Sequence, residues 1–425
     1  MTLIVFIVSL LGAMVIGAPV AFALIFCGVM LMTYMGMFNT QIIAQNMMIG
    51  ADTFTLLAIP FFVLAGELMN AGGLSKRIID FSIACVGHIR GGLGIVAIFA
   101  AIIMASISGS AAADTAALAA ILIPMMAKAG YNVPRSAGLI AAGGVIAPVI
   151  PPSMAFIVFG VAANVSISKL FMAGIVPGIL MGLSLIVTWL LVVRKDKIES
   201  LPKASWSERG RQAARAVWAL GMPVIILGGI KMGIVTPTEA AVVAAFYALF
   251  VGMFVYGELN LSELPKVLLS AAKTTSAIMF LVCAALVSAW LITAANIPNE
   301  ITGFIEPLID HPKLLMFVIM VLILIVGTAL DLTPTILILT PVLLPIVVKA
   351  GIDPIYFGVM FIMNCCIGLL TPPVGVVLNV VSGVGKIPLG RVITGVWPFL
   401  IAETIVLFLL VLFPQIVTIP ANWLY

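Results

Sequence analysis

The chain has 425 residues, of which 63% are hydrophobic and only 8% charged, with a formal net charge of +4. Soluble globular domains carry about a quarter charged residues, so this composition excludes that class and indicates an integral membrane protein. The long apolar runs show no regular apolar-polar alternation, which favours helices over a β-barrel and predicts an all-α polytopic membrane protein.

The first apolar stretch, Thr2 to Tyr34, is interrupted by Gly17-Ala18-Pro19 and is long enough for one kinked span or two shorter helices. Because it lacks a basic start, it is expected to be a retained membrane segment rather than a signal peptide. A span over Phe54 to Met69 follows. The next stretch, Asn70 to Arg90, has an amphipathic pattern that predicts a helix lying at the membrane interface.

Residues 93–126 are apolar but carry serines and an aspartate near their centre. About 20 residues are enough to cross a bilayer, and polar side chains at its middle are costly. We therefore expect a re-entrant helical hairpin with a polar tip at mid-membrane, containing Ser106, Ser108, Ser110 and Asp114.

The next apolar stretch, 137–163, contains Pro151-Pro152. Two consecutive prolines remove two backbone donors and clash with the preceding turn, so a helix, an unwound loop and a second helix are expected. A span from Leu170 to Val193 leads into the basic stretch 194–215, which holds seven of the twenty Lys and Arg. The positive-inside rule predicts a cytoplasmic loop there, and its three acids make it too mixed to be a nucleic-acid site.

The same order of segments then repeats. After an apolar stretch from Ala219 to Tyr256, a span is expected over Ser270 to Ala295, an amphipathic segment over Ile297 to Pro312, a second hairpin over 314–348, a second broken helix over 355–383 at Pro372-Pro373, and a closing span over Val392 to Ile419.

A constant offset of 221 residues relates the two halves. It carries Pro124 onto Pro345, Lys128-Ala129-Gly130 onto Lys349-Ala350-Gly351, and one proline pair onto the other, which indicates an internal duplication. We predict two repeats, 1–215 and 216–425, which are inverted if each crosses the membrane an odd number of times. Inverted repeats with broken helices are typical of secondary transporters, whose sites lie at the midplane where the repeats meet.

An unwound helix leaves carbonyl oxygens without partners where water is scarce, so a cation or a polar ligand is needed. Carbonyls on either side of the proline pairs, with hydroxyls from the hairpin tips, would form an all-oxygen cage suited to sodium. The alternative is that these small residues only permit close helix packing. The candidates are the carbonyls of Ala147, Ile150, Pro152, Gly368, Thr371 and Pro373, with the hydroxyls of Ser106, Ser108, Ser110, Thr328, Thr333 and Thr335.

The aspartates at the two tips, Asp114 and Asp331, are functional candidates because intramembrane carboxylates are costly. Each could assist an ion site, carry a proton, contact substrate or cap a helix. Cations are sparse inside the spans, so an anionic substrate would rely on helix N-termini at the tips. The candidate substrate contacts are Ser110, Asp114, Asp331, Thr333 and Thr335.

Missing motifs argue against the common enzyme classes, while an intramembrane hydrolase with a tip serine and Asp114 or Asp331 stays open. The sequence has no GxxxxGK[ST], HExxH or GxSxG pattern, and no base is placed to activate a tip serine. Five cysteines in apolar context show no CxxC spacing, and two isolated histidines make a poor metal site. We expect no cofactor and no metal other than a coupling ion.

Several motifs together resemble the large membrane subunit of TRAP (tripartite ATP-independent periplasmic) transporters, within the ion transporter superfamily of elevator-type carriers. They are Ser108-Gly109-Ser110-Ala111, Ala113-Asp114-Thr115-Ala116, Ile150-Pro151-Pro152-Ser153, Thr236-Pro237-Thr238-Glu239-Ala240 and Thr371-Pro372-Pro373-Val374-Gly375. The resemblance covers the whole chain.

The resemblance implies uptake of an organic acid anion across the bacterial inner membrane, driven by a sodium gradient. It also implies two partners, a periplasmic substrate-binding protein and a small four-helix membrane subunit expected as a separate chain. A stand-alone secondary anion carrier is the alternative. The overall sequence is similar to subunits associated with sugar acids such as 2,3-diketogulonate, while C4-dicarboxylates and sialic acid stay open.

The resemblance also assigns ion ligands by position. One sodium site would combine Ser106 or Ser108 with Ala147, Ile150 and Pro152. The second would combine Gly327 or Thr328 with Gly368, Thr371 and Pro373. Ala147 stands where many members have glycine, a change that a carbonyl ligand survives.

Overall fold

The computed structural model describes residues 1–194, 196, 201–297, 300 and 308–424, and all regular structure within these ranges is helical. Eight helices of the described part are long and apolar enough to cross a membrane. The prediction of an all-α polytopic membrane protein is therefore confirmed.

The first apolar stretch forms two helices rather than one kinked span. α1 (Thr2–Val15) and α2 (Val20–Tyr34) are separated by Gly17, whose φ of +87° is available to glycine at little cost. α3 (Thr40–Ala51) was not predicted, and it begins where the Asn39 side chain accepts a hydrogen bond from the Gln41 amide at 2.8 Å. After the short 3-10 helix η1 (Phe54–Leu57) come α4 (Ala58–Ala71) and α5 (Leu74–Val86).

Both expected hairpins and both broken helices are present, within a few residues of the predicted bounds. In the first half they are α6 (Gly92–Ser108) with α7 (Ala111–Lys128) and α8 (Val133–Gly144) with α9 (Met154–Ala163), followed by the long α10 (Ile167–Val193). In the second half they are α15 (Pro312–Gly327) with α16 (Leu332–Lys349) and α17 (Pro354–Leu370) with α18 (Val376–Gly385), followed by α19 (Leu389–Leu412). Both ends of α7 and α16 differ by 221 residues, so the duplication extends to the structure.

The prediction of a loop through residue 215 was wrong in its second half. α11 (Trp206–Lys231) begins there because the Ser205 side chain accepts a hydrogen bond from the Glu208 amide at 3.1 Å. Residues 195 and 197–200 of that stretch lie outside the described residues.

The motif Thr236-Pro237-Thr238-Glu239 starts α12 (Pro237–Phe250) as a capping box. The Glu239 carboxylate accepts from the Thr236 amide at 2.7 Å, and the Thr236 oxygen accepts from the Glu239 amide at 3.3 Å. A short π-helix, η2 (Val251–Val255), extends it, and α13 (Leu264–Ala294) follows. The expected amphipathic segment Ile297–Pro312 falls largely outside the described residues.

The closing segment is not the single span that was expected. α19 ends at Leu412, and α20 (Gln415–Leu424) begins after Pro414. Phe413 has φ −122° and ψ 70°, since a residue before proline is pushed out of the helical region.

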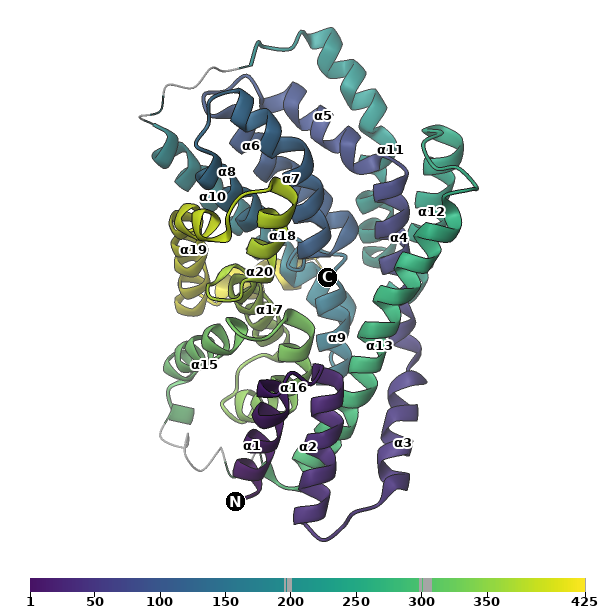
Figure 1. The fold of residues 1–425 in the computed structure, drawn as a ribbon, viewed down its shortest axis with the longest axis vertical. Helices are drawn as coiled ribbons and strands as arrows, with labels where there is room; N and C mark the ends of the chain where they lie inside the picture. The colour runs from purple at the N-terminus through teal and green to yellow at the C-terminus, as the bar shows by residue number, and fades with distance from the viewer. Residues whose placement is uncertain (195, 197–200, 298–299, 301–307, 425) are drawn as a thin grey trace.

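The two halves pack on each other reciprocally (Figure 1). α9 of the first half packs against α16 of the second, and the equivalent α18 packs against α7. In the same way α8 packs against α19, and α17 packs against α10. Such an exchange of equivalent contacts is what a two-fold axis between the repeats requires. The orientation of that axis relative to a membrane and the division at residues 215 and 216 stay predictions.

The remaining helices form a wall beside this core (Figure 1). α13 packs against α2, α3 and α4, while α12 packs against α4 and α11 against α5. In the view of Figure 1 the hairpin α6–α7 lies in the upper half and the hairpin α15–α16 in the lower half. The two broken helices run between them, and every residue of α17 from Tyr356 to Leu370 is buried.

α8 and α19 cross where Gly138 of the first helix meets Gly395 of the second, and this contact gives a test of the packing. A Cβ atom at Gly395 would lie 1.9 Å from the Pro134 carbonyl oxygen, whereas a Cβ at Gly390 of the same helix meets nothing within 4 Å. We expect Gly395→Ala to lower the free energy of unfolding by about 1–3 kcal/mol through overpacking. Gly390→Ala is the matched control and should leave stability unchanged or raise it by up to about 1 kcal/mol.

Thermal unfolding in detergent would compare the two variants with the parent protein. Equal midpoints for Gly395→Ala and Gly390→Ala would contradict the close approach of these helices.

Candidate functional site

The tip of the first hairpin is a two-residue turn. Gly109 has φ +60°, which ends α6, and the Ser110 oxygen accepts a hydrogen bond from the Ala113 amide at 3.4 Å, which starts α7. Ser106, one turn earlier, donates to the Ile103 carbonyl at 2.6 Å and keeps its oxygen lone pairs.

Asp114 is held at this tip by Ser108. The Ser108 hydroxyl donates to Asp114 Oδ1 at 2.5 Å and accepts from the Ser110 amide at 3.1 Å. Asp114 is 1% exposed, and its second oxygen has no hydrogen-bond partner among the described residues. Ser108 and Asp114 border a small hollow against Gly66 and Asn70 of α4, so both side chains face the wall.

The first unwound loop, residues 145–153, is stabilised by the side chain of Ser153. The Ser153 hydroxyl donates to the Pro148 carbonyl at 2.5 Å, and its oxygen accepts from the Phe156 amide at 3.3 Å to start α9. The peptide bond between Pro151 and Pro152 is cis. No described residue donates a hydrogen bond to the predicted carbonyl ligands, those of Ala147, Ile150 and Pro152, and all three residues are buried.

The first tip rests on this loop. A Cβ atom at Gly109 would lie 2.7 Å from the Pro152 carbonyl oxygen, so only glycine allows the contact. The hairpin tip and the free carbonyls predicted to act together are therefore neighbours.

The second tip has a different cap. The Asp331 carboxylate accepts from the Leu332 amide at 2.9 Å and starts α16, and the Thr335 hydroxyl donates to the Asp331 carbonyl at 2.8 Å. Thr328 donates to the Ile325 carbonyl at 2.8 Å. Thr333 is half-buried beside them.

The second unwound loop is shorter than expected. α17 continues to Leu370, so Gly368 is helical, and its carbonyl accepts from the Thr371 amide at 2.9 Å. The Gly368 carbonyl was predicted to be one of the unpaired ligands, and in the structure it has this backbone partner. The carbonyls of Thr371 and Pro373 receive no hydrogen bond from the described residues, and the peptide bond between Pro372 and Pro373 is cis.

The second tip nevertheless meets its broken helix at glycines. A Cβ atom at Gly368 would lie 2.8 Å from the Cα, C and O atoms of Gly327. The offset of 221 pairs these two residues with Ala147 and Ser106, so each hairpin contacts the broken helix of its own half.

The two aspartates are not equivalent. The offset places Asp331 opposite Ser110, and both residues are the N-caps of their helices. It pairs Asp114 with Thr335, and both are buried one helical turn after the N-cap. Capping, one of the roles left open from sequence, is therefore what Asp331 does, whereas Asp114 is fixed by Ser108.

The two sites differ in exposure. Around the first tip Asp114, Ala147 and Pro152 are buried, whereas at the second tip Asp331 and Pro373 are exposed. α7 carries Asp114 in its first turn, and α16 carries Asp331 at its N-cap. Each carboxylate offsets the positive end of its helix dipole. Each tip therefore favours a cation, or an anion that arrives together with one.

Three further polar side chains, those of Glu67, Glu403 and Asn364, lie within helices outside the two hairpins. Glu67 accepts from the Ser270 hydroxyl at 3.0 Å. Glu403 is fully buried, with both carboxyl oxygens unpaired among the described residues. Asn364, which the sequence analysis missed, is also fully buried on α17 and donates to the Met320 carbonyl at 2.5 Å. A single asparagine in an otherwise apolar helix was the available signal.

Comparison with known proteins places this architecture in a family. The profile described as tripartite ATP-independent periplasmic transporter, DctM component, matches residues 7–416. The chain is 56% identical over 424 residues to the 2,3-diketo-L-gulonate TRAP transporter large permease protein YiaN of Escherichia coli K12, with 100% of both chains covered. It is 41% identical to the sialic acid TRAP transporter large permease protein SiaM of Vibrio cholerae, over 95% of each chain.

A solved structure supports the fold at low sequence identity. The YdaH transporter of Alcanivorax borkumensis superposes with a TM-score of 0.62 at 14% identity, covering 87% of this chain and 86% of that one. TRAP permeases of this kind are bacterial inner-membrane transport components and not enzymes. The chain belongs to the DctM family, the large permease subunits of tripartite ATP-independent periplasmic transporters.

Proposed function

We propose that this chain is the membrane carrier of a sodium-gradient-driven, binding-protein-dependent uptake system for an organic acid anion. The observation that carries the proposal is the seating of each hairpin tip on a broken helix that presents unpaired carbonyls. Leaving a buried carbonyl unpaired costs roughly 1–3 kcal/mol, and this cost applies to the first loop, where Ala147, Ile150 and Pro152 are buried. A hard cation coordinated by oxygen would offset that cost without needing a donor.

The preferred first ion site combines Ser106 with the carbonyls of Ala147, Ile150 and Pro152. We favour Ser106 over Ser108 because the Ser108 hydroxyl is already bonded to Asp114, and the Cα and Cβ atoms of Ser108 pack near Gly66 of α4. The second ion site combines the Gly327 and Thr328 tip with the carbonyls of Thr371 and Pro373, and with Gly368 on the helix behind them.

The substrate contacts that we propose lie on the accessible side of the tips. Ser110, Asp331 and Thr333 are half-buried or exposed, whereas Asp114 and Thr335 are buried and hydrogen-bonded at the tips. We assign the latter two a positioning role for substrate binding. Asp331 would accept hydrogen bonds from sugar hydroxyls, and a sodium ion would balance the acid group of the substrate.

A sugar acid of the 2,3-diketogulonate type is the favoured substrate, because the relative named for that compound shares 56% of residues over the full length. Sialic acid, named for a relative at 41% identity, and C4-dicarboxylates are the other candidates. We further propose that the hairpins and broken helices travel as a body along the wall of α11 to α13, as in an elevator carrier. A small membrane subunit and a periplasmic binding protein would complete the system.

The direct test is uptake of labelled 2,3-diketogulonate into proteoliposomes that contain this chain and its small membrane partner. Binding protein is added outside, and an inward sodium gradient is imposed or replaced by potassium. We expect uptake only when sodium and binding protein are both present. Uptake without binding protein would instead identify a stand-alone anion carrier, and uptake in potassium alone would remove sodium coupling.

The tip contact provides a second prediction. Gly368→Ala places a methyl group against the Gly327 backbone and should separate the tip from its broken helix. We expect uptake to fall on the order of tenfold or more, because a shift of about 1 Å at a binding site has effects of that size. Gly383→Ala, on α18 with nothing within 4 Å of its Cβ position, is the matched control. Both variants should first be shown to reach the membrane in equal amounts.

The roles of the aspartate caps can be separated by isosteric changes. Asparagine caps a helix as well as aspartate does, so Asp331→Asn should preserve stability while lowering uptake if the carboxylate binds substrate. Asp353 caps α17 by accepting from the Ile355 and Tyr356 amides, away from the tips. Asp353→Asn should therefore change neither property. Normal uptake by Asp331→Asn would restrict Asp331 to capping.

A further inference from the structure

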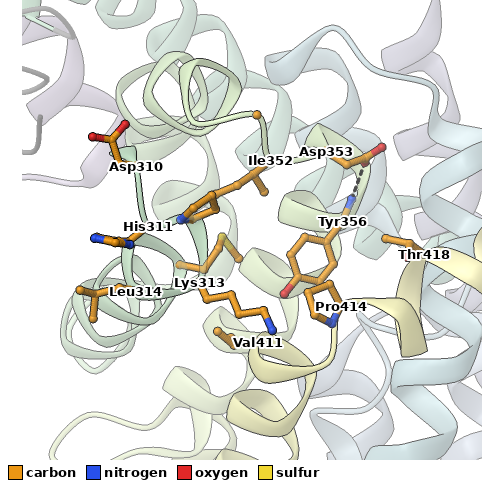
Figure 2. A pocket seen from close by; sticks show the side chains of 13 residues that line it. Asp310, His311, Lys313, Leu314, Ile352, Asp353, Tyr356, Val411, Pro414 and Thr418 are labelled. Atoms are coloured by element: carbon orange, nitrogen blue, oxygen red, sulfur yellow. Dashed lines mark hydrogen bonds between the residues drawn. The ribbon is translucent and has the colours of Figure 1, made fainter. Parts of the chain in front are cut away.

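An open hollow of about 850 Å³ lies at the end of the second repeat where several helices terminate (Figure 2). The start of α15, the turn between α16 and α17, and the turn between α19 and α20 surround it. Its walls are mainly apolar, with Ile352, Val411 and Pro414 among them. In the view of Figure 2 Asp310 and His311 lie at one end and Thr418 at the other.

The equivalent place in the first repeat is filled by aromatic side chains. Trp189 is 1% exposed, donates from Nε1 to the Gly91 carbonyl at 2.8 Å, and stacks on Tyr131 with ring centroids 5.9 Å apart. A Cβ atom at Gly94 would lie 2.0 Å from the indole, so glycine is required to admit it. Arg135 closes the same end through an ion pair with Asp196 at 2.8 Å.

The second repeat lacks the aromatic pair formed by Trp189 and Tyr131 in the first. With the offset of 221, Leu410 replaces Trp189, Ile352 replaces Tyr131 and Tyr356 replaces Arg135. Leu315 stands at the position of Gly94 and is fully buried. Of these residues Ile352 and Tyr356 line the hollow, which therefore corresponds to the place that Tyr131 and Arg135 close in the first repeat. An apolar occupant is expected to fill it, because apolar surface is costly to leave in water.

The polar groups around the hollow leave one cation available. Asp353 is used as the cap of α17, and the Tyr356 hydroxyl donates to the Leu410 carbonyl at 3.0 Å. Lys313 lines the hollow and forms no ion pair with any residue that the structure describes. His311 lies beside it at the start of α15.

The position of the hollow specifies the class of ligand. The open end of a re-entrant hairpin, here the start of α15 and the end of α16, lies at the boundary between hydrocarbon and water, where lipid headgroups are found. The hollow also joins the apolar exposed face of α15, which includes Leu314 at 48% exposure and Phe317 at 46%. A ligand with an apolar chain and an anionic group would fill the walls and meet Lys313.

We propose that this hollow is a binding site for a glycerophospholipid, with an acyl chain in the apolar cleft and the phosphate at Lys313. The continuity with the exposed face of α15 favours a lipid over a polypeptide segment. The site is separate from the hairpin tips and does not depend on which substrate is transported.

The test is native mass spectrometry of the full chain, purified with any small subunit that accompanies it, after delipidation and titration with dioleoylphosphatidylglycerol. Lys313→Gln should weaken the tightest lipid adduct about fivefold, the factor that corresponds to ~1 kcal/mol per cation at a lipid headgroup. Ile352→Trp, which restores an aromatic ring to the hollow, should abolish that adduct. Lys349→Gln is the matched control, since Lys349 is exposed at the end of α16 and does not line the hollow.

Size-exclusion profiles and thermal midpoints would show that each variant is folded. If Ile352→Trp does not fold, Lys313→Gln still tests the proposal. Equal lipid binding by the parent, Lys313→Gln and Ile352→Trp would overturn the proposal. Loss of a co-purifying polypeptide instead of a lipid in Ile352→Trp would overturn it in favour of a protein partner. Competition by inorganic phosphate alone would show that the acyl chain is not recognised.

Discussion

The requirement that backbone polar groups be satisfied where water is scarce governs this structure. An unbroken helix meets that requirement within itself, and most of the chain does so. At two places the proline pairs prevent it, and the loops around Pro151 and Pro372 leave carbonyl oxygens unpaired. Side chains repair only part of the loss, as when Ser153 bonds the Pro148 carbonyl. One of the remaining oxygens, that of Pro152, lies beside the first hairpin tip at Gly109, and this contact supports the proposal of an ion site there.

Glycine makes these meetings possible by permitting contact between backbones. Gly109 against Pro152 and Gly327 against Gly368 leave no room for a side chain between tip and helix. The same need for close approach recurs at the crossing of α8 and α19. Because packed interiors tolerate little added volume, the geometry of the sites depends on the absence of these few methyl groups.

Most of the architecture could be predicted from the sequence because its signals are strong and local. Polar residues at the centre of apolar runs predicted both hairpins, and paired prolines predicted both broken helices. The offset of 221 residues predicted which elements would correspond. The errors came from weaker signals. α3 carries too many polar residues to stand out as an apolar helix, α11 begins at a serine cap within a basic stretch, and Pro414 ends α19 early.

The detailed roles at the tips could not be predicted because they depend on side-chain partners. Sequence alone treated Asp114 and Asp331 alike, whereas one is fixed by Ser108 and the other caps α16. It also treated the Gly368 carbonyl as an unpaired ligand, although this carbonyl accepts from the Thr371 amide. Neither distinction has a signature in composition or spacing.

The exchange of partners between the halves has a mechanical consequence. Since α9 packs on α16 and α18 packs on α7, one helix of each hairpin contacts a helix that belongs to the other half. A displacement of one hairpin would therefore pull the opposite broken helix, and through it the other hairpin. The two halves are therefore coupled mechanically, so a shift at one hairpin would alter the packing of the other without any direct contact between the two tips.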